Sequence, residues 1–187
     1  LFVSGDAERL VGTDLMRLLS SADYRIFNLE APLTNDDTPI KKCGPNLRAP
    51  VGAVNGFALL GVGLLTLANN HIMDHGAAGL SSTESALSGA NIAYVGAGET
   101  LEQAKTPYLF ETGGKRIGVY ACAEHEFSIA SEQSPGANPF DPLNTPDDIA
   151  RLKESCDHVI VLYHGGKEHY RYPSPGLRKI CRKLVEK

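Results

Sequence analysis

The stretch LTLANNHIMDHG, residues 65–76, begins as an apolar run and ends in amides, imidazoles and a carboxylate. The apolar half is typical of a buried strand. The polar half places four chemically capable side chains where that strand ends: Asn69, Asn70, His71 and Asp74. In open α/β sheets the ligand site lies outside the carboxyl ends of the strands, so this stretch predicts a sheet with a site at its edge.

Short apolar runs alternate with helical patterns on both sides of this stretch, which indicates an α/β fold. The expected strands are residues 1–5, 24–30, 64–69, 92–96 and 159–163, with a β-hairpin over 107–123. The expected helices are residues 11–22, 51–60, 79–90 and 147–155, and a last one that begins after Pro175. Segments 31–50 and 132–148 are rich in Pro, Gly, Asn and Asp, which predicts two long irregular loops.

The composition is that of a globular protein. With 187 residues, 42% of them hydrophobic and 21% charged, the chain can bury one sizeable core, so we expect a single domain. The net charge is -4, and no basic run exceeds Lys41-Lys42 or the terminal RKICRKLVEK. We therefore expect no nucleic-acid partner.

Neither a signal peptide nor a membrane span is predicted. No run of 18 apolar residues occurs, and the first residues lack a basic and apolar leader, so membrane association is expected only through segments outside this sequence. The sequence begins at Leu1 rather than Met and ends at Lys187 inside a helical pattern, which we interpret as part of a longer chain. The four scattered cysteines have no C-x-x-C spacing, which favours reduced, structural thiols.

Polar residues follow four of the predicted strands. They are Asp6, then Asn28 and Glu30, then Asn70 and His71, and finally His164. Each has an ordinary structural explanation on its own, such as helix N-capping for Asp6. Their coincidence at four strand ends favours a shared site. Carboxylate, amide and imidazole donors together suit a divalent metal such as Mn, Fe or Zn.

Several motifs occur together in a specific order. They are GD at 5–6, NLEAPLT at 28–34, LANNHIMDHG at 67–76, VGAG at 95–98 and HGGKEHYRYPSP at 164–175. The chain thereby resembles the CapA-type proteins of bacterial capsule or poly-γ-glutamate synthesis, a family similar to the calcineurin-like metallophosphoesterases. The resemblance covers nearly the whole chain. It implies a layered fold, with central β-sheets flanked by helices, in one domain over 1–187 that is incomplete because the final G-H-x-H motif is absent.

The resemblance also implies roles for individual residues. Glu8 stands where the D-x-H motif has its His, so only four protein ligands are expected for two metal ions, which predicts weak or partial occupancy. The implied metal ligands are Asp6, Glu30, Asn70 and His164. His71 would protonate the leaving group, and Asp74 would orient the His71 ring. Apart from the resemblance, we expect Asn28, Asn69, Glu168 and His169 to bind the substrate; Glu168 and His169 closely follow the HGG motif, and a solvated loop is the alternative interpretation of both.

Two functions from different classes remain open. One is a metal-dependent hydrolase acting on a phosphoester or on an anionic polymer, for which the resemblance suggests the cell envelope or another extracytoplasmic site. The alternative is a non-catalytic polymer-binding or assembly component of an export system. Independently of the function, we expect that an incompletely covered core allows a homodimer to form. The segment Glu124, His125 and Glu126 follows a strand and is either another edge of the site or an exposed turn.

Overall fold

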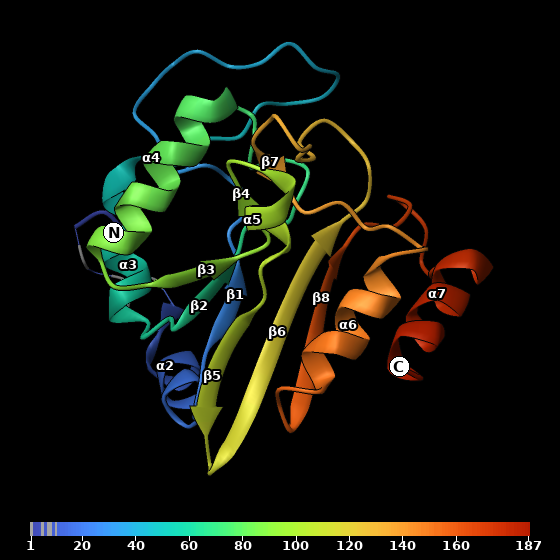
Figure 1. Ribbon diagram of the computed structural model, residues 1–187. Coiled ribbons are helices and arrows are strands. Elements are labelled where there is room, and N and C mark those ends of the chain that lie inside the picture. Colours follow the sequence, from blue (N-terminus) through green and yellow to red (C-terminus); the bar gives the residue numbers. More distant parts are fainter. Residues whose placement is uncertain (1, 5, 7–8, 10) are drawn as a thin grey trace.

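A computed structural model describes residues 2–4, 6, 9 and 11–187 of the chain. Its first sheet contains three parallel strands in the order β1 (Ile26–Asn28), β2 (Leu64–Thr66) and β3 (Ala93–Val95) (Figure 1). All three residues of β2 are buried, as expected for the central strand of a parallel sheet. These strands confirm three of the predicted ones, although each is shorter than the apolar run that predicts it.

The second sheet also has three strands, β5 (Tyr108–Thr112), β6 (Lys115–Ala123) and β8 (His158–His164). Strands β5 and β6 form the predicted hairpin, and β6 pairs in parallel with β8. Gly113 and Gly114 connect the hairpin with φ values of 56° and 72°. Positive φ at both central residues is what a tight two-residue hairpin turn requires, and glycine adopts it at little cost.

A third, two-stranded sheet pairs β4 (Ala97–Gly98) with β7 (Gly136–Ala137) in antiparallel orientation. Two residues are too few to show a strand periodicity, so the sequence did not predict this pair.

Helices flank the sheets. They are α2 (Thr13–Ser20), the short η1 (Val51–Ala53), α3 (Val54–Leu59), α4 (Gly76–Gly89), α5 (Leu101–Lys105), α6 (Thr145–Lys153) and α7 (Pro175–Val185). All except α5 match a predicted helix, with shifted boundaries. Helices α3 and α4 lie beside the first sheet, and α6 and α7 lie beside the second (Figure 1). Among the described residues, no helix combines the length and apolar character needed to cross a membrane.

The main core lies between the first sheet, α4 and β6. Its largest fully buried members are Leu33, Leu64, Leu65, Leu67, Ile72, Leu80, Leu87 and Val119. A second cluster, between the second sheet, α6 and α7, contains Tyr120, Cys122, Phe140, Ile149, Leu152 and Leu184. The prediction of central sheets flanked by helices is therefore confirmed.

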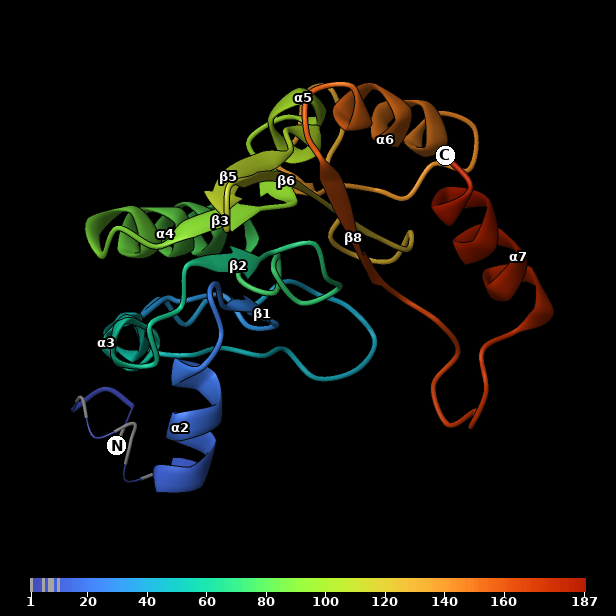
Figure 2. The same ribbon diagram turned by 90° about the horizontal axis from the view of Figure 1, so that it is seen from below.

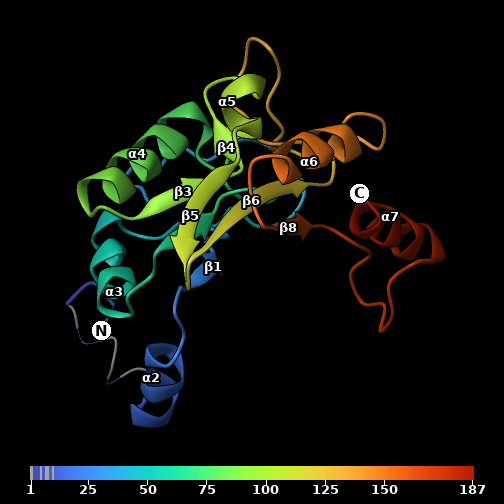
Figure 3. The same ribbon diagram turned by 60° about the horizontal axis from the view of Figure 1, so that its bottom comes forward.

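The predicted strand at residues 1–5 is wrong for the part that the structure describes. Residues 2–4 form a turn, and residues 1 and 5 lie outside the described positions. Phe2 packs edge-on against Phe57 of α3 with ring centroids 5.5 Å apart, and the Asn55 amide donates to the carbonyl of Val3 at 3.2 Å. The ring of Phe2 is thus used in packing on α3, away from the second sheet and α7 (Figures 2 and 3).

Candidate functional site

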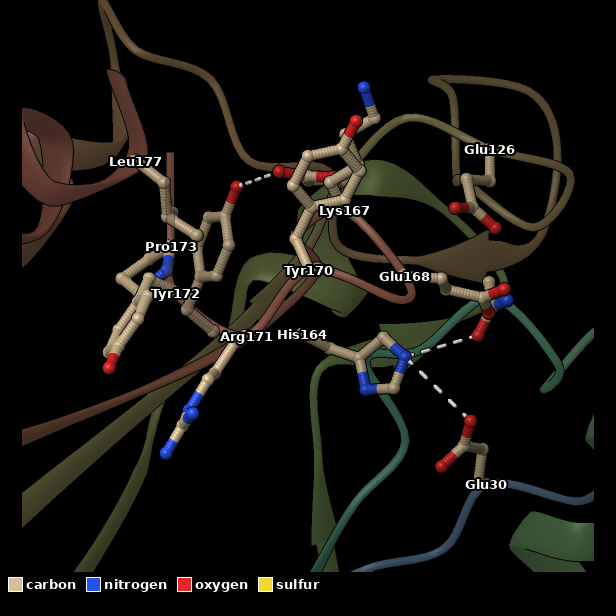
Figure 4. Close-up of a pocket in the computed structure, with 15 residues that line it drawn as sticks. Glu30, Glu126, His164, Lys167, Glu168, Tyr170, Arg171, Tyr172, Pro173 and Leu177 are labelled. Carbon is tan, nitrogen blue, oxygen red and sulfur yellow. Dashed lines mark hydrogen bonds and ion pairs between the residues drawn. The ribbon is translucent and has the colours of Figure 1, made fainter. Parts of the chain in front are cut away.

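Three strand ends meet at one place. Glu30 follows β1, Asn70 follows β2, and His164 is the last residue of β8. The Nε2 atom of His164 lies 3.1 Å from Oδ1 of Asn70 and 3.9 Å from Oε1 of Glu30 (Figure 4). β1 and β2 are parallel neighbours, so their carboxyl ends lie at one edge of the first sheet, and β8 of the second sheet ends beside that edge.

A buried amide fixes the spacing of two of these strand ends. Asn69 is 0% exposed, and its Nδ2 donates to the carbonyl of Leu29 at 2.9 Å and to Oδ1 of Asn28 at 3.3 Å. Nδ2 of Asn28 in turn donates to Oε2 of Glu30 at 3.2 Å, and Oδ1 of Asn69 accepts from the backbone of His71 at 3.0 Å. Asn28 and Asn69 therefore position Glu30 and His71, and Asn69 lies inside the protein, where a substrate would not reach it.

The donor atoms at this junction fit a divalent cation. A ring nitrogen faces an amide oxygen and a carboxylate oxygen, so two electron-rich oxygens lie within 4 Å of this nitrogen and require a proton or a cation between them and it. One carboxylate, one amide and one imidazole suit Mn, Fe or Zn. No group of three or more His, Cys, Asp or Glu side chains suited to a metal occurs among the described residues, so the Asn70 amide is needed as the third donor.

The structure does not bring Asp6 to this junction. Asp6 is exposed, and its Oδ2 accepts a hydrogen bond from Ser4 at 3.3 Å. The packing of Phe2 on α3 keeps the described N-terminal residues near that helix rather than at a strand end of the sheet. Glu8, the other expected position in this motif, lies outside the described residues.

His71 is held by a buried carboxylate. Its Nδ1 lies 2.7 Å from Oδ2 of Asp74, a side chain that is 0% exposed. Residues 71–74 form a turn, with the Asp74 amide donating to the His71 carbonyl at 3.0 Å, so a spacing of three residues is enough for the contact. The Leu47 amide donates to the same Oδ2 at 2.6 Å. Gly76, with φ 63°, then turns the chain into α4.

Lys42 completes this group and was missed in the sequence. Its Nζ forms an ion pair with Oδ1 of Asp74 and lies 3.2 Å from Nδ1 of His71, and the side chain is only 2% exposed. The sequence shows Lys42 in an irregular, polar loop, where a lysine is normally solvated. The loop over residues 31–50 instead folds onto the turn at 71–74, and only the burial of Lys42 reveals its part in the site.

An open pocket of about 500 Å³ lies beside the junction. Its lining includes Glu30, Asn70, Glu124, Glu126, Tyr163, His164, Lys167, Glu168, Tyr170, Arg171, Tyr172 and Leu177 (Figure 4). The Tyr163 hydroxyl donates to Oε1 of Glu124 at 2.7 Å, and burial together with that contact raises the pKa of Tyr163. Glu124 and Glu126 thus favour the interpretation of their segment as another edge of the site.

The segment that follows β8 forms an exposed arm over residues 165–174. Lys167 lies over the ring of Tyr170 at 4.4 Å, and Arg171 lies over the ring of Tyr172 at 5.7 Å. Of the two residues predicted here, Glu168 lines the pocket, whereas His169 is 93% exposed and does not. The aromatic and basic residues of the arm were not predicted, although their alternation in KEHYRY was a visible signal.

Comparison with known proteins gives a match along almost the whole chain. The family model described as "Bacterial capsule synthesis protein PGA_cap" matches residues 6–187. "Capsule biosynthesis protein CapA" of Bacillus anthracis is 30% identical over 177 residues, covering 90% of this chain and 43% of the relative. "PGA biosynthesis protein CapA" of Bacillus subtilis (strain 168) is 26% identical over 174 residues, covering 90% and 46%. The chain thus spans less than half the length of these relatives.

Solved structures overlap with the chain only loosely. NAD nucleotidase (NadN) of Haemophilus influenzae has a TM-score of 0.48 and 15% identity, covering 70% of this chain and 31% of that one. The 5'-nucleotidase precursor of Thermus thermophilus has a TM-score of 0.45 and 21% identity, covering 60% and 23%. Overlap at this level says nothing about activity.

Proposed function

The chain belongs to the bacterial capsule synthesis protein family PGA_cap, and we propose that it is a metal-dependent hydrolase that acts on an anionic polymer or a phosphoester in capsule or poly-γ-glutamate synthesis. The observation that carries this proposal is the meeting of Glu30, Asn70 and His164 at three strand ends, with contacts of 3.1 and 3.9 Å to one ring nitrogen. A set of donors this close, on three separate elements, is the arrangement that a metal site needs. One main core shared by the first sheet and β6 supports treating the chain as one domain.

The three donors would hold one divalent ion. Glu30 and His164 are partly exposed, so a ligand in the adjoining pocket can reach them. A divalent ion at this position would act as a Lewis acid toward a phosphoryl or carbonyl oxygen and lower the pKa of a nearby water.

His71 would protonate the leaving group. Because its Nδ1 faces Asp74 at 2.7 Å and Lys42 at 3.2 Å, Nε2 is the ring nitrogen left to transfer a proton. Asp74 is fully buried and paired with Lys42, so the ring is held by a fixed carboxylate rather than by a mobile surface side chain.

The decisive experiment compares two histidine variants in the full-length protein. Phosphate release from generic phosphoesters and shortening of poly-γ-glutamate would be measured with and without Mn²⁺. We expect His71→Ala to lower kcat by about 10²- to 10⁴-fold while Mn²⁺ binding is retained. His158→Ala, an exposed histidine at the opposite end of β8, is the matched control and should keep wild-type turnover.

The alternative function predicts a different result. If the wild type shows no Mn²⁺-dependent turnover of either substrate class, the hydrolase proposal fails, and a non-catalytic polymer-binding component becomes the better explanation of the family membership.

A further inference from the structure

Positive charge is concentrated at one end of the chain. Residues 165–187 contain seven of the 18 Lys and Arg residues but only two of the 22 Asp and Glu residues. The chain as a whole has a net charge of -4, so the remainder is strongly acidic. Such a charge asymmetry indicates a surface for an anionic partner.

Helix α7 presents four of these seven cations on one face. Leu184 is buried in the second core cluster, Ile180 packs against that cluster, and Leu177 lines the pocket. The opposite face is exposed and forms a shallow groove lined by Pro175, Arg178, Lys179, Arg182, Lys183 and Glu186. Most apolar residues of the helix are thus used internally, with Val185 at its last position exposed, and four of the six residues that line the groove are cationic.

The cations on this face are not neutralised by the protein. In the part of the chain that the structure describes, none of the four lysines and arginines of the groove forms an ion pair with an acidic side chain. Elsewhere, Arg151 and Lys115 do form such pairs. The helix dipole favours Arg182 and Lys183 near the C-terminal end of α7. It does not favour Arg178, which lies in the first turn. A row of mutually repelling cations is therefore better explained by a ligand than by helix stability.

The first turn of α7 lies between this face and the pocket, since Pro173 lines the pocket and Pro175 lines the groove. Lys167 and Arg171 of the exposed arm line the pocket, as does Leu177 in the first turn of α7. The helix extends from there along the outer side of the molecule (Figures 2 and 3). Eleven helical residues span about 16 Å, which is longer than a small substrate and suits an extended chain.

We infer that the cationic face of α7 binds a polymer that carries carboxylates and guides it into the pocket. This inference rests on the proposed function, since it assigns the polymer substrate to that site. A membrane surface fits less well because Ile180 and Leu184 of α7 pack against the protein, and Val185 is the one large apolar side chain exposed on the described helix, which is too little for insertion. A nucleic-acid duplex fits less well because it is wide enough to meet the acidic remainder of the chain, whereas one polymer strand can follow a single helix face.

The test measures binding rather than turnover. Anisotropy of labelled poly-γ-glutamate would be followed for the full-length wild type and for Arg178→Glu/Arg182→Glu. The matched control is Arg17→Glu/Lys115→Glu, which reverses the same number of exposed charges on α2 and at the start of β6. We expect the α7 variant to bind about tenfold more weakly, the size expected for losing two exposed charge pairs, and the control to bind like wild type. Added salt should weaken wild-type binding.

The outcomes separate this inference from the proposed hydrolase. Three results would overturn the inference: both double variants weaken polymer binding equally, the wild type does not bind the polymer, or the wild type binds anionic phospholipid vesicles or duplex DNA more tightly than the polymer. None of those results would contradict the hydrolase proposal, which is tested separately by the turnover of small phosphoesters. Polymer binding that depends on α7 without any turnover would uphold the inference and overturn the hydrolase. Arg178→Gln/Arg182→Gln provides a milder variant should the charge reversal disturb folding.

Discussion

Replacing Lys42 by methionine should destabilise the protein strongly. Methionine retains most of the volume of the side chain but removes its charge, leaving the fully buried Asp74 carboxylate without its cation. Removing one partner of a buried ion pair costs about 3–5 kcal/mol, because the other charge stays buried and unpaired. Asp74 would keep its contacts with His71 and the Leu47 amide, which places the expected loss toward the lower part of that range.

The matched control is an exposed pair of the same residue types. Lys115 and Asp157 lie 3.0 Å apart with side chains 57% and 40% exposed. Lys115→Met should therefore lower the free energy of unfolding by about 1 kcal/mol or less. The double variant Lys42→Met/Asp74→Asn should recover much of the loss, because an amide can still accept the Leu47 hydrogen bond without a buried charge.

Urea denaturation, followed by circular dichroism, measures these differences as shifts of the transition midpoint at constant slope. Two results would refute this reasoning. Lys42→Met could lower the free energy of unfolding no more than Lys115→Met does, or the addition of Asp74→Asn could lower it further. Either result would mean that Lys42 is hydrated in solution and that the loop over residues 31–50 is not anchored by this ion pair.

Three other predictions concern the site and the core. Titration of the 187-residue chain with Mn²⁺ should show at most one weak site, lost in Glu30→Gln, and two tight sites would contradict the donor set. Burial, and secondarily the charge of Glu99, raises the pKa of Glu84, so the ionisation of Glu84 destabilises the folded state as the pH rises. Glu84→Gln should therefore raise Tm more at pH 7 than at pH 4, and an equal rise at the two pH values would refute this. Burial raises the pKa of the Cys122 thiol to about 12, so iodoacetamide at pH 8 should label the exposed Cys43 before Cys122, as peptide mass spectrometry can show.

The sequence predicted the parts of the fold in which local pattern and tertiary environment agree. The apolar run before Asn69 becomes the buried central strand β2. The run before His164 also becomes a strand, β8, but it lies at the edge of the second sheet with its residues half-buried or exposed. The Gly113-Gly114 turn is predictable since its backbone angles favour glycine. The same strand-end logic brings Glu30, Asn70 and His164 together.

The remaining features depend on contacts that no local pattern records. Residues 2–4 have the apolar character of a strand, but the ring of Phe2 packs on Phe57, which lies far away in sequence. Lys42 has the composition of a solvated loop and becomes buried only because Asp74 offers a counter-charge. The strands β4 and β7 are held by their neighbours and are too short to have a pattern of their own.

The buried amide of Asn69 makes the candidate site mechanically inseparable from the first sheet. The Asn69 side chain donates to the carbonyl of Leu29 and to the side-chain oxygen of Asn28, both at the end of β1, while the Asn69 backbone directly precedes Asn70 after β2. Any strain that spreads β1 from β2 is transmitted directly to the gap between Glu30 and Asn70. A packing defect in the core beneath would then register as a change in ligand affinity before any loss of secondary structure.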